Sequence, residues 1–173
     1  MKLPRLVIAG VKSGVGKSSI ATGIMQALAD QGYQVQGFKV GPDYIDPGFH
    51  SLACGRPSRN LDLFLLGEEK VRELFISHAG KADISIIEGV MGLFDGSQDA
   101  GNPASTAAVS KALQAPVLLV VDCRSMAQSI APLVKGFMEY DEEVKIAGVI
   151  LNQVGSPNHE RILKDALGGL SVP

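Results

Sequence analysis

The sequence predicts an α/β fold of three layers, in which helices cover both faces of a mostly parallel sheet. Apolar, β-branched runs alternate along the chain with helical patterns of about ten or more residues, which is typical of this class. Size agrees with it, because a chain of 173 residues that is 46% apolar can bury the core of one domain. We expect a single domain over residues 1–173, with strands at 6–9, 35–40, 84–87, 117–121 and 146–151.

The charge balance argues against nucleic acid as a partner. The chain carries 16 Lys and Arg against 18 Asp and Glu, and the basic residues form no stripe. We also expect no membrane association, because the apolar run at 6–9 is too short for a signal peptide or a membrane span. Cys54 and Cys123 lack metal-ligand spacing, so we expect reduced thiols in a cytoplasmic protein.

The segment 6–19 joins the first strand to the first helix through a glycine-rich loop that ends in Gly-Lys-Ser. A strand before the loop and a helical pattern after it are the context in which this motif, the phosphate loop, binds a nucleotide. Glycine can adopt positive φ and has no Cβ, so backbone N–H groups can turn toward an anion at the positive end of the helix. We predict that Lys17 reaches the β- and γ-phosphates and that Ser18 binds Mg²⁺. The residues predicted to hold the nucleotide are Gly10, Lys12, Ser13, Gly14, Val15, Gly16, Lys17, Ser18, Ser19 and, from a later strand, Asn152.

One residue of this loop departs from the strict pattern. That pattern has glycine at position 11, whereas this chain has Val11 and places a glycine one residue earlier, at Gly10. The longer loop is typical of a subgroup of phosphate loops. The alternative interpretation is a plain glycine-rich turn between a strand and a helix.

The next elements lead to a second loop at the same edge of the sheet. A helix is predicted at 18–31, closed by Gly32. The second strand ends within the segment 39–50, where two prolines and two glycines surround two aspartates. This composition predicts that no helix or strand continues there and that an ordered loop follows. This loop follows the carboxyl end of a parallel strand, where ligands bind in open sheets. A further helix is predicted at 68–78.

Four carboxylates are predicted to lie on loops at this ligand edge: Asp43, Asp46, Glu88 and Asp95. Glu88 follows a strand beside the phosphate loop, where an acid that holds Mg²⁺ or its bound water is expected. A nucleotide switch needs only one or two acids, so the surplus favours an enzyme that positions a second substrate or further Mg²⁺. The alternative for each acid is a structural role, as a loop or capping carboxylate.

The remaining predicted helices lie at 102–113, 128–139 and 158–167. Asn152 follows the last strand, and the aspartate that pairs with guanine in GTP-binding domains is absent from the residues after it. This favours adenine, with Asn152 bonding its exocyclic amine, whereas the alternative is that Asn152 only closes the strand. The final residues, 168–173, resemble the middle of a helix-to-strand connection, so we expect a fragment of a longer protein.

Three segments resemble one enzyme family. Lys-Val-Gly-Pro-Asp-Tyr-Ile-Asp-Pro at 39–47, Gly-Arg-Pro-Ser-Arg-Asn-Leu-Asp at 55–62 and Glu-Gly-Val-Met-Gly-Leu-Phe-Asp-Gly at 88–96 are similar to the N-terminal, ATP-using domain of the cobyrinate a,c-diamide synthases. The resemblance covers nearly the whole chain and implies a P-loop NTPase fold of the dethiobiotin synthetase and MinD-like type. It also implies an ATP- and Mg²⁺-dependent amidoligase that converts the a and c acetates of a corrinoid into amides through acyl phosphates. Ammonia would come from glutamine through a C-terminal glutaminase domain, which we expect to lie outside this chain.

The resemblance also implies roles for individual residues. Asp43 and Asp46 would organise Mg²⁺ and the phosphorylated intermediate, and Asp95 would lie nearer the corrinoid or the incoming ammonia. The implied catalytic residues are Lys17, Asp43, Asp46 and Asp95, and the implied metal ligands are Ser18, Asp43 and Glu88.

Alternatives remain open for the substrate and for the class of function. The substrate could be hydrogenobyrinate, which lacks cobalt, or sirohydrochlorin in its nickel form. An alternative of another class is a dimerising ATPase switch similar to MinD and ParA. Lys12 favours the switch because partition-type ATPases carry an extra lysine that reaches the partner's nucleotide in a homodimer, whereas the 41–47 motif argues against it. Lys12 could equally be a solvated loop lysine.

Overall fold

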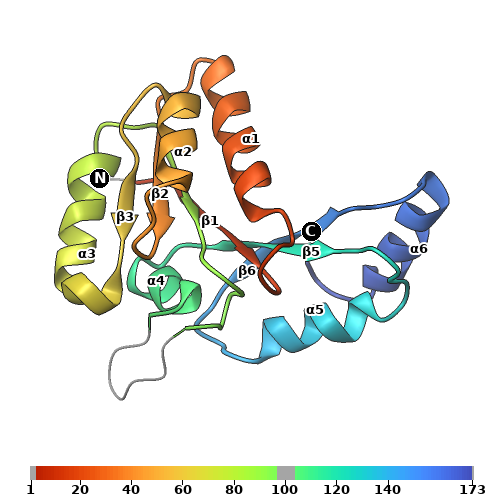
Figure 1. Ribbon diagram of the computed structural model, residues 1–173. Helices are drawn as coiled ribbons and strands as arrows, with labels where there is room; N and C mark the ends of the chain where they lie inside the picture. Colours follow the sequence, from red (N-terminus) through yellow and green to blue (C-terminus); the bar gives the residue numbers. More distant parts are fainter. Residues whose placement is uncertain (1–2, 97–103, 173) are drawn as a thin grey trace.

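The computed structural model describes residues 3–96 and 104–172, and this part of the chain forms a sheet of six parallel strands in the order β3-β2-β4-β1-β5-β6 (Figure 1). The strands are β1 (Arg5–Gly10), β2 (Val35–Val40), β3 (Arg59–Leu61), β4 (Ile84–Glu88), β5 (Val117–Asp122) and β6 (Ile146–Asn152). The helices are α1 (Lys17–Asp30), α2 (Asp46–Cys54), α3 (Leu63–Ala79), α4 (Thr106–Ala112), α5 (Ile130–Glu139) and α6 (Pro157–Leu167). The predicted α/β fold with a parallel sheet is confirmed.

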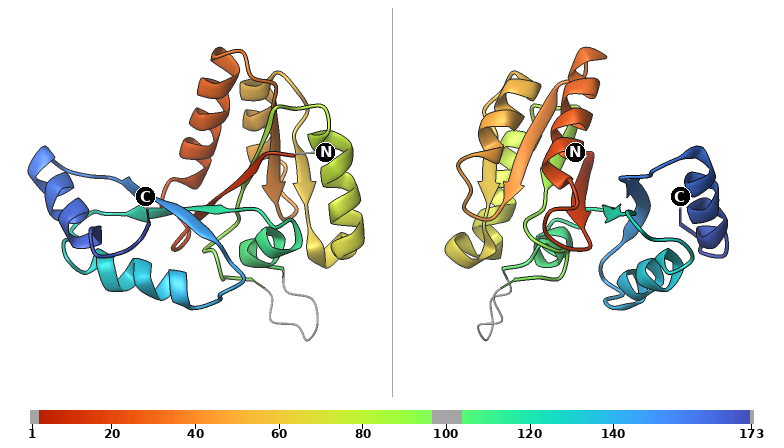
Figure 2. Two further views of the ribbon diagram at one scale, coloured as in Figure 1. Left: turned by 180° about the vertical axis from the view of Figure 1, so that it is seen from behind. Right: turned by 45° about the vertical axis from the view of Figure 1, so that its right-hand side comes forward.

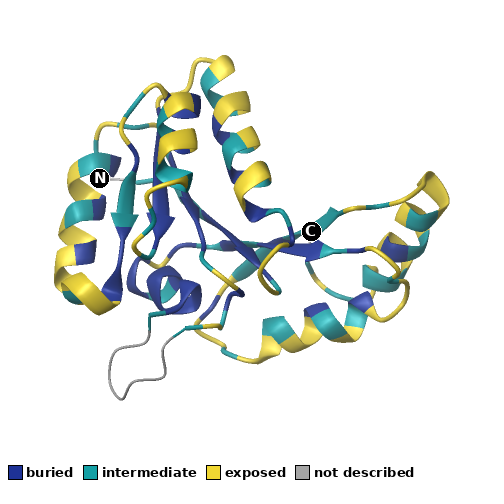
Figure 3. Ribbon diagram, in the orientation of Figure 1, coloured by how far each residue is buried: buried dark blue, intermediate teal, exposed yellow. Residues whose placement is uncertain are grey.

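Alternate residues of the central strands face two different helical layers. In β1, Val7 and Ala9 belong to the core that α3, α4, α5 and α6 cover, whereas Ile8 belongs to the core that α1 and α2 cover. Helices α1 and α2 lie side by side in each view, and α5 and α6 lie beside β5 and β6 (Figure 2). The central strands are largely buried, whereas α1, α2, α3, α5 and α6 expose their outer faces (Figure 3). Because β4 lies between β1 and β2, the carboxyl ends of these three strands form one continuous edge.

Helix α2 corrects one prediction. The segment 39–50 was predicted to continue as an ordered loop after the strand, but α2 begins inside it, at Asp46. Pro47 is the reason, because proline is tolerated in the first turn of a helix, where its missing N–H has no intrahelical partner. The helix ends at Cys54, and Gly55 follows in the left-handed region with φ +61°.

Strand β3 and the first turn of α3 were not predicted from the sequence. Of the three residues of β3 only Leu61 is buried, so the strand has no apolar run to mark it. Helix α3 begins at Leu63 rather than at 68, because the Asp62 side chain caps it by accepting a hydrogen bond from the Leu65 N–H at 3.0 Å. Gly67, with φ +74°, kinks the helix near the predicted start.

The other helices lie close to their predicted positions. Helix α1 ends at Asp30, and Gly32 follows with φ +90°, as predicted for a C-terminal cap. Helix α5 begins at Ile130 rather than at 128, and α6 begins at Pro157 rather than at 158. Residues 102 and 103 of the predicted helix 102–113 lie outside the described residues, and α4 begins at Thr106. Within residues 3–96 and 104–172, no helix is both long and apolar enough to cross a membrane.

Candidate functional site

The loop between β1 and α1 is closed by three glycines with different roles. A Cβ on Gly10 would lie 2.5 Å from Val15 Cγ2 and 2.9 Å from the Lys12 carbonyl oxygen, so Gly10 supplies space rather than positive φ. Gly14 and Gly16 adopt φ of +75° and +95°, which side-chain-bearing residues rarely accept. The predicted conformation of the loop is therefore confirmed at Gly14 and Gly16, whereas at Gly10 only the need for a small residue holds.

Val11 stands where the strict motif has glycine, and the structure explains why glycine is not required. The Val11 N–H donates to the Val120 carbonyl oxygen at 3.1 Å, which extends the pairing of β1 with β5 by one residue. Its side chain packs against both apolar cores. Val15 is almost fully buried and anchors the tip of the loop in the core beneath α1. The loop that remains to face a ligand runs from residue 12 to residue 18.

Lys17 is the first residue of α1, and its side chain lies inside the loop. Its Nζ donates to the Lys12 carbonyl oxygen at 3.3 Å, and only 8% of the residue is exposed. Burial lowers the pKa of Lys17, and the positive charge of Lys39 lowers it further, while the charges of Glu88, Asp95 and Asp46 act in the opposite direction. A desolvated ammonium group at the N-terminus of a helix is a strong attractor for an anion.

A buried cluster of charges connects the phosphate loop to β2 and β4. Ser18 Oγ donates to Glu88 Oε1 at 2.6 Å, and Lys39 Nζ donates to the same oxygen at 2.8 Å. Lys39 Nζ also lies 2.6 Å from Asp46 Oδ2 and 3.9 Å from Asp43 Oδ2. The register of the sheet explains the contact, because Lys39 on β2 stands directly beside Glu88 on β4. Three of the four predicted acids thus converge on one lysine.

The other oxygen of Glu88 is held from α2. His50 Nε2 lies 2.6 Å from Glu88 Oε2, and both side chains are completely buried. Burial alone would raise the pKa of Glu88, but hydrogen bonds with His50, Lys39 and Ser18 outweigh it and lower the pKa to about 2. Burial alone would lower the pKa of Lys39, but its hydrogen bonds to Asp46 and Glu88 outweigh burial and raise the pKa above its usual range. Glu88 is therefore a carboxylate and Lys39 an ammonium at neutral pH.

Lys39 and His50 were not among the predicted site residues. The signal for Lys39 in the sequence is that it is the single charged residue of β2, which implies a buried counter-charge. His50 lies four residues after Asp46 on α2, on the same helix face, but the sequence predicted no helix there. Both omissions follow from not knowing which elements are neighbours in space.

Two of the predicted acids, Asp43 and Asp95, also have a structural role. Asp43 Oδ1 accepts hydrogen bonds from the N–H groups of Ile45 at 2.8 Å and Asp46 at 3.3 Å, so it shapes the turn that starts α2. Asp95 Oδ2 accepts a hydrogen bond from the Gly92 N–H at 2.9 Å and closes a tight turn after β4. Asp95 is exposed and lies outside the cluster around Lys39, although its charge acts on Lys17.

Asn152, at the end of β6, contacts the phosphate loop directly. Its Nδ2 donates to the Val15 carbonyl oxygen at 2.8 Å, and a Cβ on Gly16 would lie only 2.4 Å from that nitrogen. The described contact of Asn152 is thus with the loop backbone, and its predicted bond to adenine stays a prediction. Lys12 and Ser13 are exposed on the loop, and Ser19 is exposed on the first turn of α1.

The sequence profile of the CobQ/CobB/MinD/ParA nucleotide binding domain matches residues 6–170. The chain belongs to this family. Its fold class as a P-loop NTPase and its general nature as a nucleotide-binding domain follow from that membership together with the loop described above.

Curated relatives in the CobQ/CobB/MinD/ParA family are similar to this chain along nearly its whole length. It is 54% identical over 171 residues to the hydrogenobyrinate a,c-diamide synthase of Streptomyces coelicolor, covering 99% of this chain and 35% of the relative. It is 50% identical over 173 residues to the cobyrinate a,c-diamide synthase of Syntrophotalea carbinolica, covering 100% of this chain and 38% of the relative. The chain therefore spans little more than a third of the length of these relatives.

Solved structures share the fold at much lower sequence identity. Chloroplast FtsY from Physcomitrella patens superposes with a TM-score of 0.66 at 16% identity, covering 100% of this chain and 57% of that one. A nucleotide-binding protein from Archaeoglobus fulgidus in complex with ADP superposes with a TM-score of 0.62 at 14% identity, covering 99% of this chain and 79% of that one. At these identities the likeness supports the architecture alone.

The donor set of this family member fits Mg²⁺ bound together with a nucleotide. Within residues 3–96 and 104–172, no group of three or more His, Cys, Asp and Glu side chains is arranged to hold a metal by itself. Mg²⁺ needs no such group, since it takes one or two protein oxygens and completes its octahedron with phosphate oxygens and water. The Ser18 hydroxyl and the Glu88 carboxylate, 2.6 Å apart beside the phosphate loop, are hard oxygen donors of this kind.

Proposed function

We propose that this chain is the synthetase part of an enzyme that amidates the a and c acetate groups of cobyrinate or of its cobalt-free form, hydrogenobyrinate, with ATP and Mg²⁺. The observation that carries the proposal is that Asp43, Asp46 and Glu88 converge on Lys39 beside the phosphate loop. Nucleotide binding alone needs fewer carboxylates than these three. The names of relatives at 50 to 54% identity support the substrate class.

In the proposed reaction, a substrate acetate attacks the γ-phosphorus of ATP, giving an acyl phosphate and ADP. Ammonia then attacks the acyl carbon, phosphate leaves, and an amide remains after loss of a proton. Ser18 and Glu88 would hold Mg²⁺, which would supply positive charge against the repulsion between the carboxylate and the triphosphate. Lys17 and the N–H groups of the loop orient the triphosphate and stabilise charge on the leaving oxygen.

The remaining predicted residues are assigned around this centre. Lys39 holds the Asp46 and Glu88 carboxylates close together, and Asp43 positions the turn that carries Asp46. Asp95 faces the incoming substrate or ammonia from the loop after β4, and Asn152 fixes the loop backbone that surrounds the phosphates.

We further propose that glutamine supplies the ammonia through a glutaminase domain in the remaining length of the relatives, of which this chain spans 35 to 38%. Free ammonium replaces that domain in a test with this chain. The chain would be incubated with Mg-ATP, ammonium and cobyrinic acid, with hydrogenobyrinic acid in a second arm, while ADP and the mass of the macrocycle are followed together. An ATP-dependent mass change of one or two carboxylate-to-amide conversions is the expected result.

The variant Lys17→Ala is expected to lower this turnover by about 100-fold or more, because the triphosphate loses its buried counter-charge. Unchanged turnover in this variant would exclude the phosphate loop as the site of the reaction. ADP release that needs no macrocycle and rises with protein concentration would instead favour a dimerising ATPase switch, for which Lys12→Ala is the discriminating variant.

A further inference from the structure

An apolar pocket of about 390 Å³ lies at the same edge of the sheet as the acids. Its walls come from residues 40–42, 61–65 and 90–91, together with Ala104 and Val109. Its volume is within the range of pockets that take small molecules or parts of larger ones. Among the described lining residues only Asp62 is charged, and that carboxylate already accepts the Leu65 N–H as the cap of α3.

The pocket shares two of its walls with the acid cluster. Residues 40–42 run directly into Asp43, and residues 90–91 follow Glu88 and Gly89. Glu88 points toward α1 and α2, where it meets Ser18 and His50, whereas Val109 belongs to the core on the opposite face, beneath α3 and α4. A ligand that filled the pocket would therefore need an arm across the 41–43 wall to reach the phosphate loop.

The walls are held rigidly by side chains outside the pocket lining. Asn60 Nδ2 donates to the carbonyl oxygens of Gly41 at 2.7 Å and Asp43 at 2.8 Å. Thr106 Oγ1 accepts from the Val90 N–H at 2.9 Å and donates to the Val90 carbonyl oxygen at 3.0 Å. The pocket is thus preformed, so a ligand does not have to order these loops on binding.

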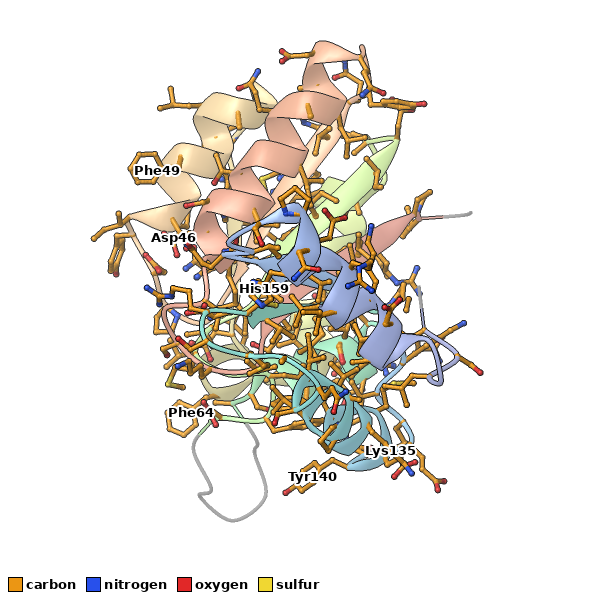
Figure 4. The ribbon with its side chains drawn as sticks, turned by 90° about the vertical axis from the view of Figure 1, so that its right-hand side faces the viewer. Asp46, Phe49, Phe64, Lys135, Tyr140 and His159 are labelled. Carbon is orange, nitrogen blue, oxygen red and sulfur yellow. The ribbon has the colours of Figure 1, made fainter. Side chains whose placement is uncertain are left out.

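The rim of the pocket leaves large apolar side chains in water. Phe64 is 52% exposed, Leu65 is 64% exposed and Met91 is 43% exposed. Met91 also adopts φ of +48°, a conformation that costs free energy for a residue other than glycine and is frequent at ligand sites. In Figure 4, Phe64 and Asp46 lie along the same edge of the molecule. Contact with an apolar ligand would remove this rim from water at a favourable free energy.

We propose that this pocket binds the methyl-bearing, apolar edge of the tetrapyrrole-derived macrocycle, so that one acetate arm crosses the 41–43 wall to the acids and the phosphate loop. The inference rests on the proposed function and deepens it. The apolar lining selects this orientation, because burying one of the macrocycle's carboxylates there without a partner would be strongly unfavourable. The pocket therefore determines which acetates can reach the γ-phosphate.

The absence of tryptophan from the chain permits a direct test. The variant Phe64→Trp places a single fluorophore at the pocket rim, and Tyr33→Trp places one before β2, at the opposite edge of the sheet. Hydrogenobyrinic acid absorbs light and quenches a nearby indole. We expect the macrocycle to quench the fluorescence of Phe64→Trp with the same concentration dependence as binding measured by equilibrium dialysis. We expect little quenching of Tyr33→Trp.

Affinity provides the second measurement. Phe64→Ala is expected to weaken macrocycle binding about tenfold and to leave ATP binding unchanged, since one large apolar contact is lost. Leu52→Ala is the matched control, because Leu52 is 81% exposed on α2 and does not line the pocket. Equal effects of the two substitutions would overturn the inference. The inference would also be overturned if dialysis showed macrocycle binding but the fluorescence of Phe64→Trp were not quenched. In that case the proposed function would stand. Failure to bind or amidate any macrocycle would refute the proposed function and the pocket together.

Discussion

At the scale of single residues, Lys39 is the side chain on which the acid cluster depends. It is 4% exposed and lies within 2.8 Å of carboxylate oxygens of both Asp46 and Glu88. A buried ion pair adds little net stability when it is intact, since desolvation offsets the attraction between the charges. Removal of one partner, however, leaves an uncompensated buried charge.

Lys39→Met is therefore expected to lower the free energy of unfolding by about 3–5 kcal/mol, because Glu88 and Asp46 would face each other without a counter-charge. Urea denaturation followed by circular dichroism measures the change. Lys70→Met is the control, since its pair with Glu73 on α3 is largely exposed and its loss should leave stability nearly unchanged. A loss as small as that of the control would mean that the cluster is not electrostatically coupled.

The sequence predicted the residues of the contiguous phosphate loop, but it did not predict that Lys39 and His50 contact Glu88 from β2 and α2. Lys17 and Ser18 were predicted because the spacing of the glycine-rich loop before them is typical of phosphate binding. Asp46 was predicted to lie at the ligand edge with three other acids, but its pairing with Lys39 was not predicted. Their contact depends on β2 lying next to β4, and local sequence does not encode that adjacency.

At the scale of elements, α4 supports the loop after β4. It is buried over nearly its whole length (Figure 3). Its first residue, Thr106, bonds both the N–H and the carbonyl of Val90, and a Cβ on Gly89 would lie 2.7 Å from the Thr106 methyl group. The helix therefore fixes the path of the chain between Glu88 and the apolar pocket.

Thr106→Val keeps the shape of the side chain but removes both hydrogen bonds to Val90. We expect a loss of about 1–3 kcal/mol in stability, because backbone polar groups lose their partners, and weaker macrocycle binding with ATP affinity preserved. Thermal unfolding and equilibrium dialysis measure the two effects. Ser110→Ala is the matched control, since Ser110 is buried on the same helix but its described hydroxyl contact is only with the Ala107 carbonyl oxygen, to which it donates. If Ser110→Ala weakened macrocycle binding as much as Thr106→Val, the loss of binding would come from a general disturbance of α4 and not from the hydrogen bonds to Val90.

Predictability at this scale followed the strength of the hydrophobic pattern. Strands β1, β2, β4, β5 and β6 were predicted to within a residue or so, because each is rich in apolar and β-branched residues. Strand β3 has two polar residues out of three, and Pro47 was interpreted as a helix breaker although it occupies the first turn of α2. The structure that a proline or a polar edge strand adopts depends on contacts with neighbouring elements. Those contacts are not visible in the local sequence, which is why both were predicted wrongly.

At the scale of the whole molecule, the cluster links stability to pH. The folded-state pKa of Glu88 is about 2, below its ordinary value of 4.5. A lowered pKa means that the ionised form stabilises the fold, so this stabilisation is complete above pH 4.5 and is lost as the pH falls toward 2.

The free energy of unfolding should accordingly fall more steeply between pH 4.5 and pH 2 in the natural chain than in Glu88→Gln, which has no proton to gain at this position. Urea titrations at several pH values measure the slopes. Glu160→Gln removes an exposed helix carboxylate paired with Lys164 and should change the slope less, and less still in high salt. Identical slopes for the natural chain and Glu88→Gln would contradict the lowered pKa.

The contacts that complete the site join distant parts of the chain, since Lys39 and Glu88 are 49 residues apart, Ser18 and Glu88 are 70 apart, and Val15 and Asn152 are 137 apart. Such contacts form only after the entropy of closing long loops has been overcome. The phosphate loop precedes β6 in the chain, yet its contact with Asn152 forms only when β6 has joined the sheet. High nucleotide affinity therefore requires the completed fold. A nucleotide that binds only the completed fold would shift the equilibrium from incompletely folded chains to folded ones by mass action.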